Sequence, residues 1–174
     1  MTDEALASRA TDGDREAFAR LFERYQRPIQ ALARRMGCGE DRSRDLAQDV
    51  FVRVLDRVGR FDPSRRFSSW IFRVAANLIR NDLEARGRWR TEGISDEPED
   101  LAPRPEIAVV TDEEARRVRE ALTRVPEALR LVLLLYFQEE RSHDEIGEIL
   151  DITPNHARVR LFRGLRRLQK ELGS

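Results

Sequence analysis

Apolar residues recur along most of this chain at intervals of three and four positions, the spacing of one face of an α-helix. Strand-like alternation is nearly absent, so the sequence predicts an all-α fold. In the first half, a helix is expected between the N-cap Asp14 and the stop signal Gly37. Its apolar face consists of Ala17, Leu21, Phe22, Tyr25, Ile29 and Leu32.

Two further helices complete a predicted N-terminal bundle. One is expected over about residues 43–58, and the other starts near Ser68 or Ser69. The turn between them contains Asp62-Pro63, a pair that favours a chain reversal. The apolar stripe of the 43–58 helix is expected to be Leu46, Val50, Phe51, Val54 and Leu55.

An acidic segment with three prolines divides the chain. Residues 91–114, TEGISDEPEDLAPRPEIAVVTDEE, hold nine acidic residues and one basic residue. Proline and dense like charge both oppose compact structure, so a linker is predicted over about residues 91–110. It separates two small domains, 1–90 and 111–174. Residues 1–90 and 115–174, on either side of the acidic segment, are each mildly basic, so the formal net charge of zero is a sum over unlike parts.

The second half has its own helical pattern. Helices are expected at about 111–124, 126–138, 142–150 and 154–171. The last two, joined by the short turn DIT, have the proportions of a helix-turn-helix, whose second helix enters the DNA major groove. Ser142 and Glu145 match a capping box, and Thr153-Pro154 supplies an N-cap and a first-turn proline.

The last helix carries five arginines between residues 158 and 167, and its apolar stripe should separate packing residues from DNA-facing ones. That stripe is expected to be Ala157, Leu161, Leu165, Leu168 and Leu172. The residues off the stripe near the helix start, which we expect to face base edges, are Asn155, His156, Arg158, Val159, Phe162 and Arg163. Arg160, Arg166 and Arg167 suit phosphates or solvent. The alternative is a solvated basic helix without a ligand.

The stretch FDPSRRFSSWIFRVAANLIRNDLEARGRWR interleaves aromatic residues with arginines. This mixture suits single-stranded nucleic acid, because unpaired bases stack on aromatic rings and guanidinium groups meet phosphates. The alternative is that Trp70 and Phe72 are core residues beside a solvated basic face, and for Trp70 alone the core interpretation is favoured.

Several function classes lack support in the sequence. The longest apolar run, Leu131–Phe137, is too short to cross a bilayer, and the N-terminus is acidic where a signal peptide is basic, so a cytoplasmic location is expected. Cys38 is the sole cysteine, and His143 and His156 lack further histidines at ligand spacing, so no metal site or cofactor is expected. Without a phosphate-binding or nucleophile motif, neither an enzyme nor catalytic residues are expected.

Taken together, these stretches resemble the extracytoplasmic-function (ECF) sigma factors, the smallest class of the sigma-70 family of bacterial transcription initiation factors. The resemblance covers nearly the whole chain. Gly13-Asp14 with AFARLFERY resembles the start of the family's region 2, and DLAQDVFVRVLDRVGRFDPSRRFSSWIFRVAANLIRNDLEARGR resembles its core-binding and promoter-melting segments. ALTRVPEALRLVLLLYFQEERSHDEIGEIL with ITPNHARVRLFRGLRRL resembles region 4, and the acidic segment stands at the family's linker.

The resemblance implies partners and site residues. Contacts with the β′ coiled coil of core RNA polymerase are implied for Asp45, Leu46, Gln48, Asp49, Phe51, Val52 and Arg53. Capture of an unstacked base of the −10 promoter element is implied for Phe61, Arg65, Phe67, Ser69, Arg73, Asn77 and Arg80. Reading of the −35 element is implied for Arg158, Val159, Phe162 and Arg163. The β flap of polymerase and an anti-sigma factor are further implied partners.

The chain also departs from the family pattern. Asn155-His156-Ala157 stands where Gly-Thr-Val is frequent, so Asn155 and His156 read a different base or touch phosphate only. Gly147 and Gly164 stand where alanine is frequent, although glycine inside a helix costs about 1 kcal/mol relative to alanine.

The sequence therefore favours a non-catalytic factor that brings polymerase to promoters and helps to melt DNA. A free-standing helix-turn-helix regulator is the main alternative, and an adaptor or anti-sigma protein is another. Because basic side chains dominate non-specific DNA affinity, a chain of zero net charge should bind DNA weakly alone. Two weak readers gain affinity when one scaffold holds both.

Overall fold

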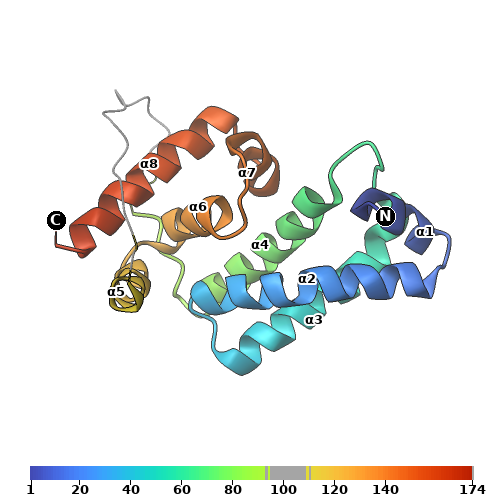
Figure 1. Cartoon of the computed structure of the whole chain (residues 1–174), viewed down its shortest axis with the longest axis horizontal. Helices are drawn as coiled ribbons and strands as arrows, with labels where there is room; N and C mark the ends of the chain where they lie inside the picture. Colours follow the sequence, from blue (N-terminus) through green and yellow to red (C-terminus); the bar gives the residue numbers. More distant parts are fainter. Residues whose placement is uncertain (93, 95–108, 110, 174) are drawn as a thin grey trace. The chain divides into compact units, whose positions relative to one another are not determined.

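The computed structural model describes residues 1–92, 94, 109 and 111–173, and in that part of the chain it contains α-helices and a short 3-10 turn but no strand (Figure 1). The predicted all-α fold is thus confirmed. The chain divides into two compact units, Met1–Leu83 with Glu148–Leu150 and Glu84–Gly147 with Asp151–Ser174. This division falls before the predicted boundary at residue 90. Most of the predicted linker lies outside the described residues.

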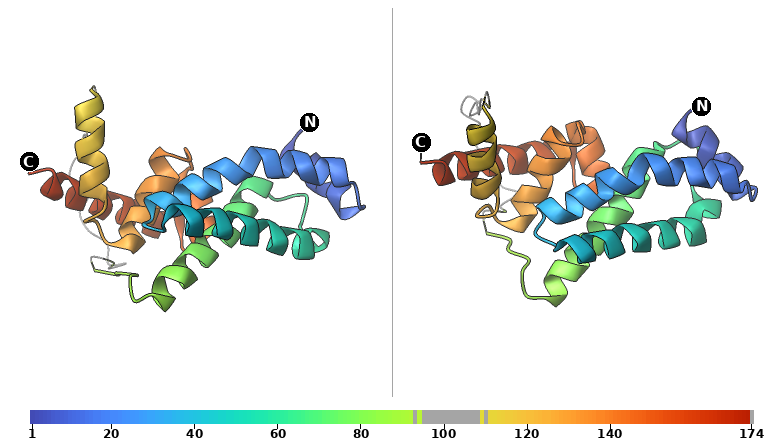
Figure 2. Two further views of the ribbon diagram at one scale, coloured as in Figure 1. Left: turned by 90° about the horizontal axis from the view of Figure 1, so that it is seen from below. Right: turned by 60° about the horizontal axis from the view of Figure 1, so that its bottom comes forward.

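The first unit is built from four helices and one 3-10 turn: α1 (Asp3–Thr11), α2 (Arg15–Arg35), α3 (Glu40–Arg57), η1 (Val58–Arg60) and α4 (Phe67–Ala85). Helices α2 and α3 run side by side (Figure 2). The N-cap predicted for α2 is present, because Asp14 Oδ1 accepts hydrogen bonds from the Glu16 and Ala17 amides at 3.0 and 3.1 Å. The bond from Ala17, followed by that from the Arg9 side chain, lowers the pKa of Asp14.

Helix α1 was not predicted, yet it is tied into the first unit at several points. Leu6 and Ala7 are fully buried, and Thr11 Oγ1 donates a hydrogen bond to the Val58 carbonyl at 3.0 Å. Glu4 Oε1 accepts a hydrogen bond from the Phe67 amide at 3.0 Å, so a carboxylate of α1 caps the first turn of α4.

A cluster of aromatic rings fixes the turn before α4. The Phe67 ring is fully buried and packs at centroid distances of 5.6, 5.4 and 5.6 Å from Tyr25, Phe61 and Trp70. The turn itself is closed by Asp62, whose Oδ1 accepts from the Ser64 amide at 2.9 Å. Aromatic pairs at these separations stabilise by about 0.5–1.5 kcal/mol beyond the area that they bury.

The second unit contains the four predicted helices: α5 (Asp112–Leu122), α6 (Glu127–Phe137), α7 (His143–Leu150) and α8 (Pro154–Glu171). Helix α6 is its core element, since every residue from Glu127 to Leu135 is buried. The predicted caps of the last two helices are present. Ser142 Oγ accepts from the Glu145 amide at 3.2 Å, and Thr153 Oγ1 accepts from the His156 amide at 3.1 Å.

Two glycines explain how tightly this unit packs. A Cβ on Gly147 would lie 2.7 Å from the Ile152 carbonyl oxygen, because the chain folds back against α7 in the turn before α8. A Cβ on Gly164 would lie 3.0 Å from Leu133 Cγ, because α8 approaches α6 closely there. Packing against backbone therefore requires glycine at 147 in spite of its low helix propensity, whereas a Cβ at 164 would need the Leu133 side chain to shift.

Gly147→Ala should destabilise the protein by about 1–3 kcal/mol, because the clash is with backbone that cannot move aside cheaply. Urea unfolding measures the change. Gly59→Ala is the matched control, since a Cβ there meets nothing within 4 Å, and it should be neutral or slightly stabilising. If both variants were equally stable, the close approach would not constrain residue 147.

Candidate nucleic-acid interface

The outward face of α3 combines acidic, amide and apolar side chains. Asp45, Gln48 and Asp49 are exposed, and Val52 and Leu55 expose 59% and 60% of their surface. The expectation that Leu55 packs in the core is wrong, because the buried stripe of α3 is narrower than predicted. Exposed apolar residues beside charged ones are typical of a protein-binding surface.

Leu46 and Phe51, two members of the predicted polymerase-binding set, are buried at 1% and 4% exposure. The Phe51 ring lies 4.7 Å from the Phe22 ring and 6.2 Å from the Phe18 ring, centroid to centroid. Both side chains are therefore part of the packing that holds α3 in the bundle.

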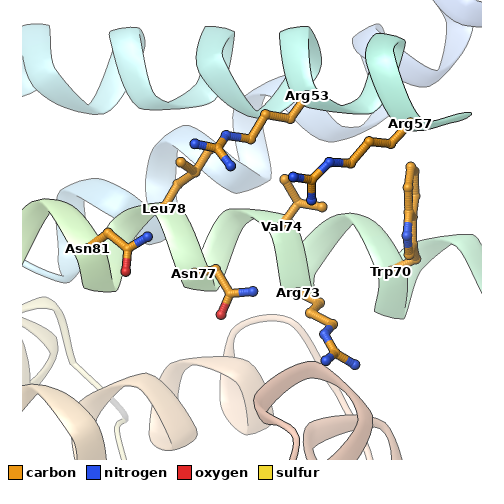
Figure 3. A pocket seen from close by; sticks show the side chains of 8 residues that line it. All are labelled: Arg53, Arg57, Trp70, Arg73, Val74, Asn77, Leu78 and Asn81. Carbon is orange, nitrogen blue, oxygen red and sulfur yellow. The ribbon is translucent and has the colours of Figure 1, made fainter.

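A basic groove lies between α3 and α4, with a volume of about 230 Å³ (Figure 3). It is lined by Arg53, Arg57, Trp70, Arg73, Val74, Asn77, Leu78 and Asn81. The lining contains three arginines and two asparagines and no acidic residue. The groove can therefore accept an anionic, hydrogen-bonding ligand that also offers a flat surface to an aromatic ring.

Two arginines of α3 contribute to this groove, and sequence reasoning did not place them there. Figure 3 shows the Arg53 and Arg57 side chains extending from α3 towards α4. Among the described residues, neither has a carboxylate within ion-pair distance. Nearby, the Arg42 Nε atom pairs with Asp82 Oδ1 at 2.7 Å and joins α3 to α4, and this hydrogen bond raises the pKa of Arg42. The groove forms only where α3 and α4 pack against each other, so the pattern of one helix does not predict it.

The residues predicted to bind the −10 element divide into two groups. Phe61, Phe67 and Ser69 are buried at 8%, 0% and 4% exposure. The arginines and the asparagine of the set are exposed, and two of them, Arg73 and Asn77, line the groove. The buried members of the set are therefore part of the packing that holds the exposed members in place.

Trp70 is partly buried and partly exposed, so it fits neither of the two alternatives that the sequence offered alone. Its ring packs 5.3 and 5.6 Å from the Phe61 and Phe67 rings, yet the residue remains partly exposed and lines the groove. It is both a packing residue and a surface for an incoming flat group.

At the start of α8, Asn155 and Arg158 are exposed, and the Arg158 Nη2 atom donates to Asn155 Oδ1 at 2.8 Å. His156 and Arg163 are half-buried. The expectation that Val159 and Phe162 face outward is wrong. They are 2% and 6% exposed, because the buried face of α8 is wider than the predicted stripe.

Comparisons with known families match both halves of the chain. A model of sigma-70 region 2 matches residues 21–90, and a model of sigma-70 region 4 matches residues 115–168. The ECF RNA polymerase sigma factor SigW of Bacillus subtilis (strain 168) is 34% identical over 173 residues, covering 92% of this chain and 91% of the relative. The RNA polymerase sigma-H factor of Pseudomonas aeruginosa is 30% identical over 98% of this chain and 93% of its own length.

A solved structure of CnrH in complex with the cytosolic domain of CnrY superimposes with a TM-score of 0.75 at 26% identity, covering 98% of this chain and 97% of that one. Two helical units that carry these two regions define a sigma factor of the sigma-70 type. The chain belongs to the ECF family of RNA polymerase sigma factors. None of the described helices is long and apolar enough to cross a membrane.

Proposed function

We propose that this alternative sigma factor distributes its work over three surfaces. The outward face of α3 binds core RNA polymerase, the α3–α4 groove holds the single-stranded −10 element, and the start of α8 reads the −35 element in duplex DNA. The groove carries the proposal, because it combines three arginines and no acidic residue with a partly exposed tryptophan.

The chemistry of the groove favours a nucleic-acid strand over a small molecule. Its volume of about 230 Å³ is smaller than that of sites that enclose drug-sized ligands. A strand that lies along the groove stacks a base on Trp70 and places phosphates near Arg53 and Arg57. Stacking of this kind contributes about 1–3 kcal/mol per base.

The exposed members of the predicted polymerase-binding set are Asp45, Gln48, Asp49, Val52 and Arg53. All but Arg53 lie on the outward face of α3, which also includes Leu55. This acidic and apolar face suits the predicted docking on the β′ coiled coil, whose surface would then be basic and apolar. Arg53 belongs to the groove, so we assign it to DNA.

At the start of α8, the accessible candidates for reading bases are Asn155, Arg158 and the half-buried His156 and Arg163. Arginine pairs bidentately with guanine, which gives about 1–3 kcal/mol of discrimination against a wrong base. Contacts with the β flap and with an anti-sigma factor are further expected. The factor acts in the cytoplasm as a binding protein and catalyses no reaction.

A free-standing helix-turn-helix regulator remains the alternative, favoured only by the capped α7–α8 pair. Transcription in vitro separates the two. With core polymerase added, this chain should direct initiation from specific promoters, whereas the isolated protein should bind duplex DNA negligibly because its net charge is zero. Tight, sequence-specific operator binding by the isolated protein, without promoter-specific initiation, would contradict the proposal.

Asp49→Ala and Arg53→Ala should separate the two faces of α3. Asp49→Ala should weaken binding to core polymerase by about tenfold, the size of a lost charged contact. Arg53→Ala should leave core binding unchanged and weaken promoter opening, which permanganate reactivity of unpaired thymines measures.

Glu23→Ala and Arg27→Ala are the controls, because both residues are exposed on α2 and neither makes an ion pair with a described residue. If Arg53→Ala weakened binding to core polymerase, Arg53 would belong to the polymerase-binding surface and not to the groove.

Arg158→Ala should reduce initiation from promoters that depend on a −35 element by about tenfold, because it removes an exposed guanidinium from the start of α8. Core binding should not change. Lys170→Ala, at the exposed far end of the same helix, is the matched control. Equal losses in the two variants would mean that the contact is general and not a base contact.

A further inference from the structure

Arg158, an exposed residue near the start of α8, makes a hydrogen bond to a neutral side chain one helical turn before it. Its Nη2 atom donates to Asn155 Oδ1 at 2.8 Å. Arg158 makes no ion pair with a described residue, so the partner that the structure gives it is Asn155. Because a guanidinium group can only donate, the contact also fixes which end of the Asn155 amide faces Arg158.

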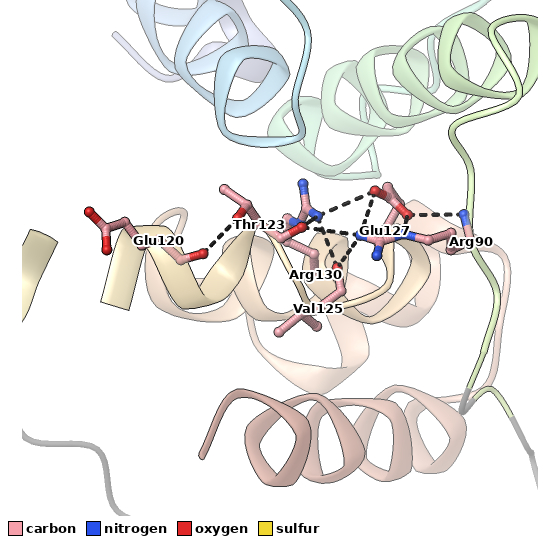
Figure 4. Close-up of polar contacts among 6 residues, drawn as sticks. All are labelled: Arg90, Glu120, Thr123, Val125, Glu127 and Arg130. Atoms are coloured by element: carbon pink, nitrogen blue, oxygen red, sulfur yellow. Dashed lines mark hydrogen bonds and ion pairs between the residues drawn. The ribbon is translucent and has the colours of Figure 1, made fainter. Parts of the chain in front are cut away.

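Other arginines of the second unit pair with carboxylates. Arg90 Nε donates to Glu127 Oε2 at 2.7 Å, and Arg130 Nη2 donates to Glu127 Oε1 at 3.3 Å (Figure 4). The hydrogen bond to Glu127 raises the pKa of Arg90, as expected for a cation held by an anion. Further along α8, Arg167 Nε donates to Glu171 Oε1 at 3.1 Å. In each of these contacts a negative charge offsets the charge of the arginine.

A neutral acceptor acts differently, because it orients a guanidinium group without offsetting its charge. The first turn of α8 contains no acidic residue, whereas the first turns of α5 and α7 contain Asp112 and Asp144. An acidic side chain would be favoured there by the helix dipole and would bind Arg158 more strongly. It would also repel the phosphates of DNA. Asn155 therefore leaves the full positive charge of Arg158 available to DNA.

The hydrogen bond also leaves Arg158 able to read a base. A guanidinium group has five N–H donors, and two of its edges each present a pair of parallel donors, which guanine O6 and N7 can accept. Asn155 occupies one of these edges and leaves the other complete. The Asn155 amide is poorly placed to read adenine, which requires its donor and acceptor together, because its acceptor oxygen is directed at Arg158.

We propose that Asn155 is a positioning residue for Arg158 in reading the −35 element and makes no base contact of its own; this deepens the proposed function and rests on it. Ordering a long, rotatable side chain at an interface opposes binding by about two- to tenfold in affinity. A guanidinium group that Asn155 already holds loses less freedom when it meets DNA. A residue by which this chain departs from the family pattern thus acts through its neighbour.

Side-chain NMR of the free, full-length protein tests the positioning directly. With ¹⁵N-labelled arginine, the rotation of the Arg158 guanidinium group about its Nε–Cζ bond is measured, and Arg158→Ala identifies the signal. Rotation should accelerate by about twofold or more in Asn155→Ala, because a hydrogen bond to a charged group is lost. Unchanged rotation would refute the positioning role, whether or not the protein acts with polymerase.

A double-mutant cycle in transcription with core polymerase tests the effect on promoter choice. The readout is the base preference, which is the ratio of initiation from two promoters that differ at one base pair of the −35 element. The pair to use is the one at which Arg158→Ala removes a preference for guanine. Asn155→Ala should reduce this preference by about two- to fivefold when Arg158 is present and should have no further effect in Arg158→Ala.

Two results of the cycle would contradict the inference. Losses that multiply independently would mean that Asn155 contacts DNA by itself. If Arg158→Ala relaxed the preference at no base pair, there would be no reading by Arg158 for Asn155 to support. Lys170→Ala, at the exposed far end of α8, is the control and should leave the preference unchanged in both backgrounds.

Asn155→Asp is the conservative variant. It keeps an acceptor for Arg158 and loses the amide donor, so it should retain the base preference. Its added negative charge should lower initiation from both promoters equally, and the ratio cancels such a loss. If Asn155→Asp lost as much preference as Asn155→Ala, the amide donor would be the functional group and the positioning role would be wrong.

Failure of the proposed function gives a different result. A wild-type chain that supports no promoter-specific initiation with core polymerase would refute the proposed function, and the inference on promoter choice with it, whatever the NMR shows. A wild-type chain that initiates but shows no coupling between Asn155 and Arg158 would refute the inference alone. Asn155, Arg158 and Lys170 are all exposed, so the variants should fold, which circular dichroism checks.

Discussion

The burial of the Phe67 ring against Tyr25, Phe61 and Trp70 is the contact on which the groove of the first unit depends. Phe67 is the first residue of α4, so its position sets where that helix begins and how it faces α3. The α4 residues that line the groove, from Trp70 to Asn81, lie about one to four helical turns after Phe67. Movement of this ring would shift Trp70 and the arginines of the groove relative to one another.

The groove and the outward face of α3 carry opposite charges, which suits them to different partners. The groove offers guanidinium groups and no carboxylate, while the outward face of the same α3 helix offers Asp45 and Asp49. The zero net charge of the whole chain keeps its general attraction to DNA small. Polymerase therefore supplies the affinity, and this chain supplies the choice of promoter.

Local features were predictable from the sequence. The helical class, the caps at Asp14, Ser142 and Thr153, and the last four helices follow from periodicity and from short-range hydrogen bonding. These features depend on residues within a few positions of one another, so a single sequence contains what is needed to find them.

Features that depend on packing between helices were missed or misjudged. The width of a buried face depends on how many neighbours a helix has, which is why Leu55, Val159 and Phe162 were assigned to the wrong side. The groove brings arginines of α3 together with residues of α4 that lie 13 or more positions further along the chain, and Arg90 pairs with Glu127, 37 positions away. No periodicity marks such pairs.

The hydrogen bond from the Phe67 amide to Glu4 has a consequence for the length of the functional unit. The matched region 2 begins at residue 21, so α1 lies before it, yet α1 supplies the carboxylate at the first turn of α4. Asp3 of α1 also contacts Arg24 and Tyr25. Trimming the chain to the shared region would leave that turn uncapped. The N-terminal segment therefore supports the helix that lines the proposed DNA-binding groove, although it holds none of the residues assigned to DNA.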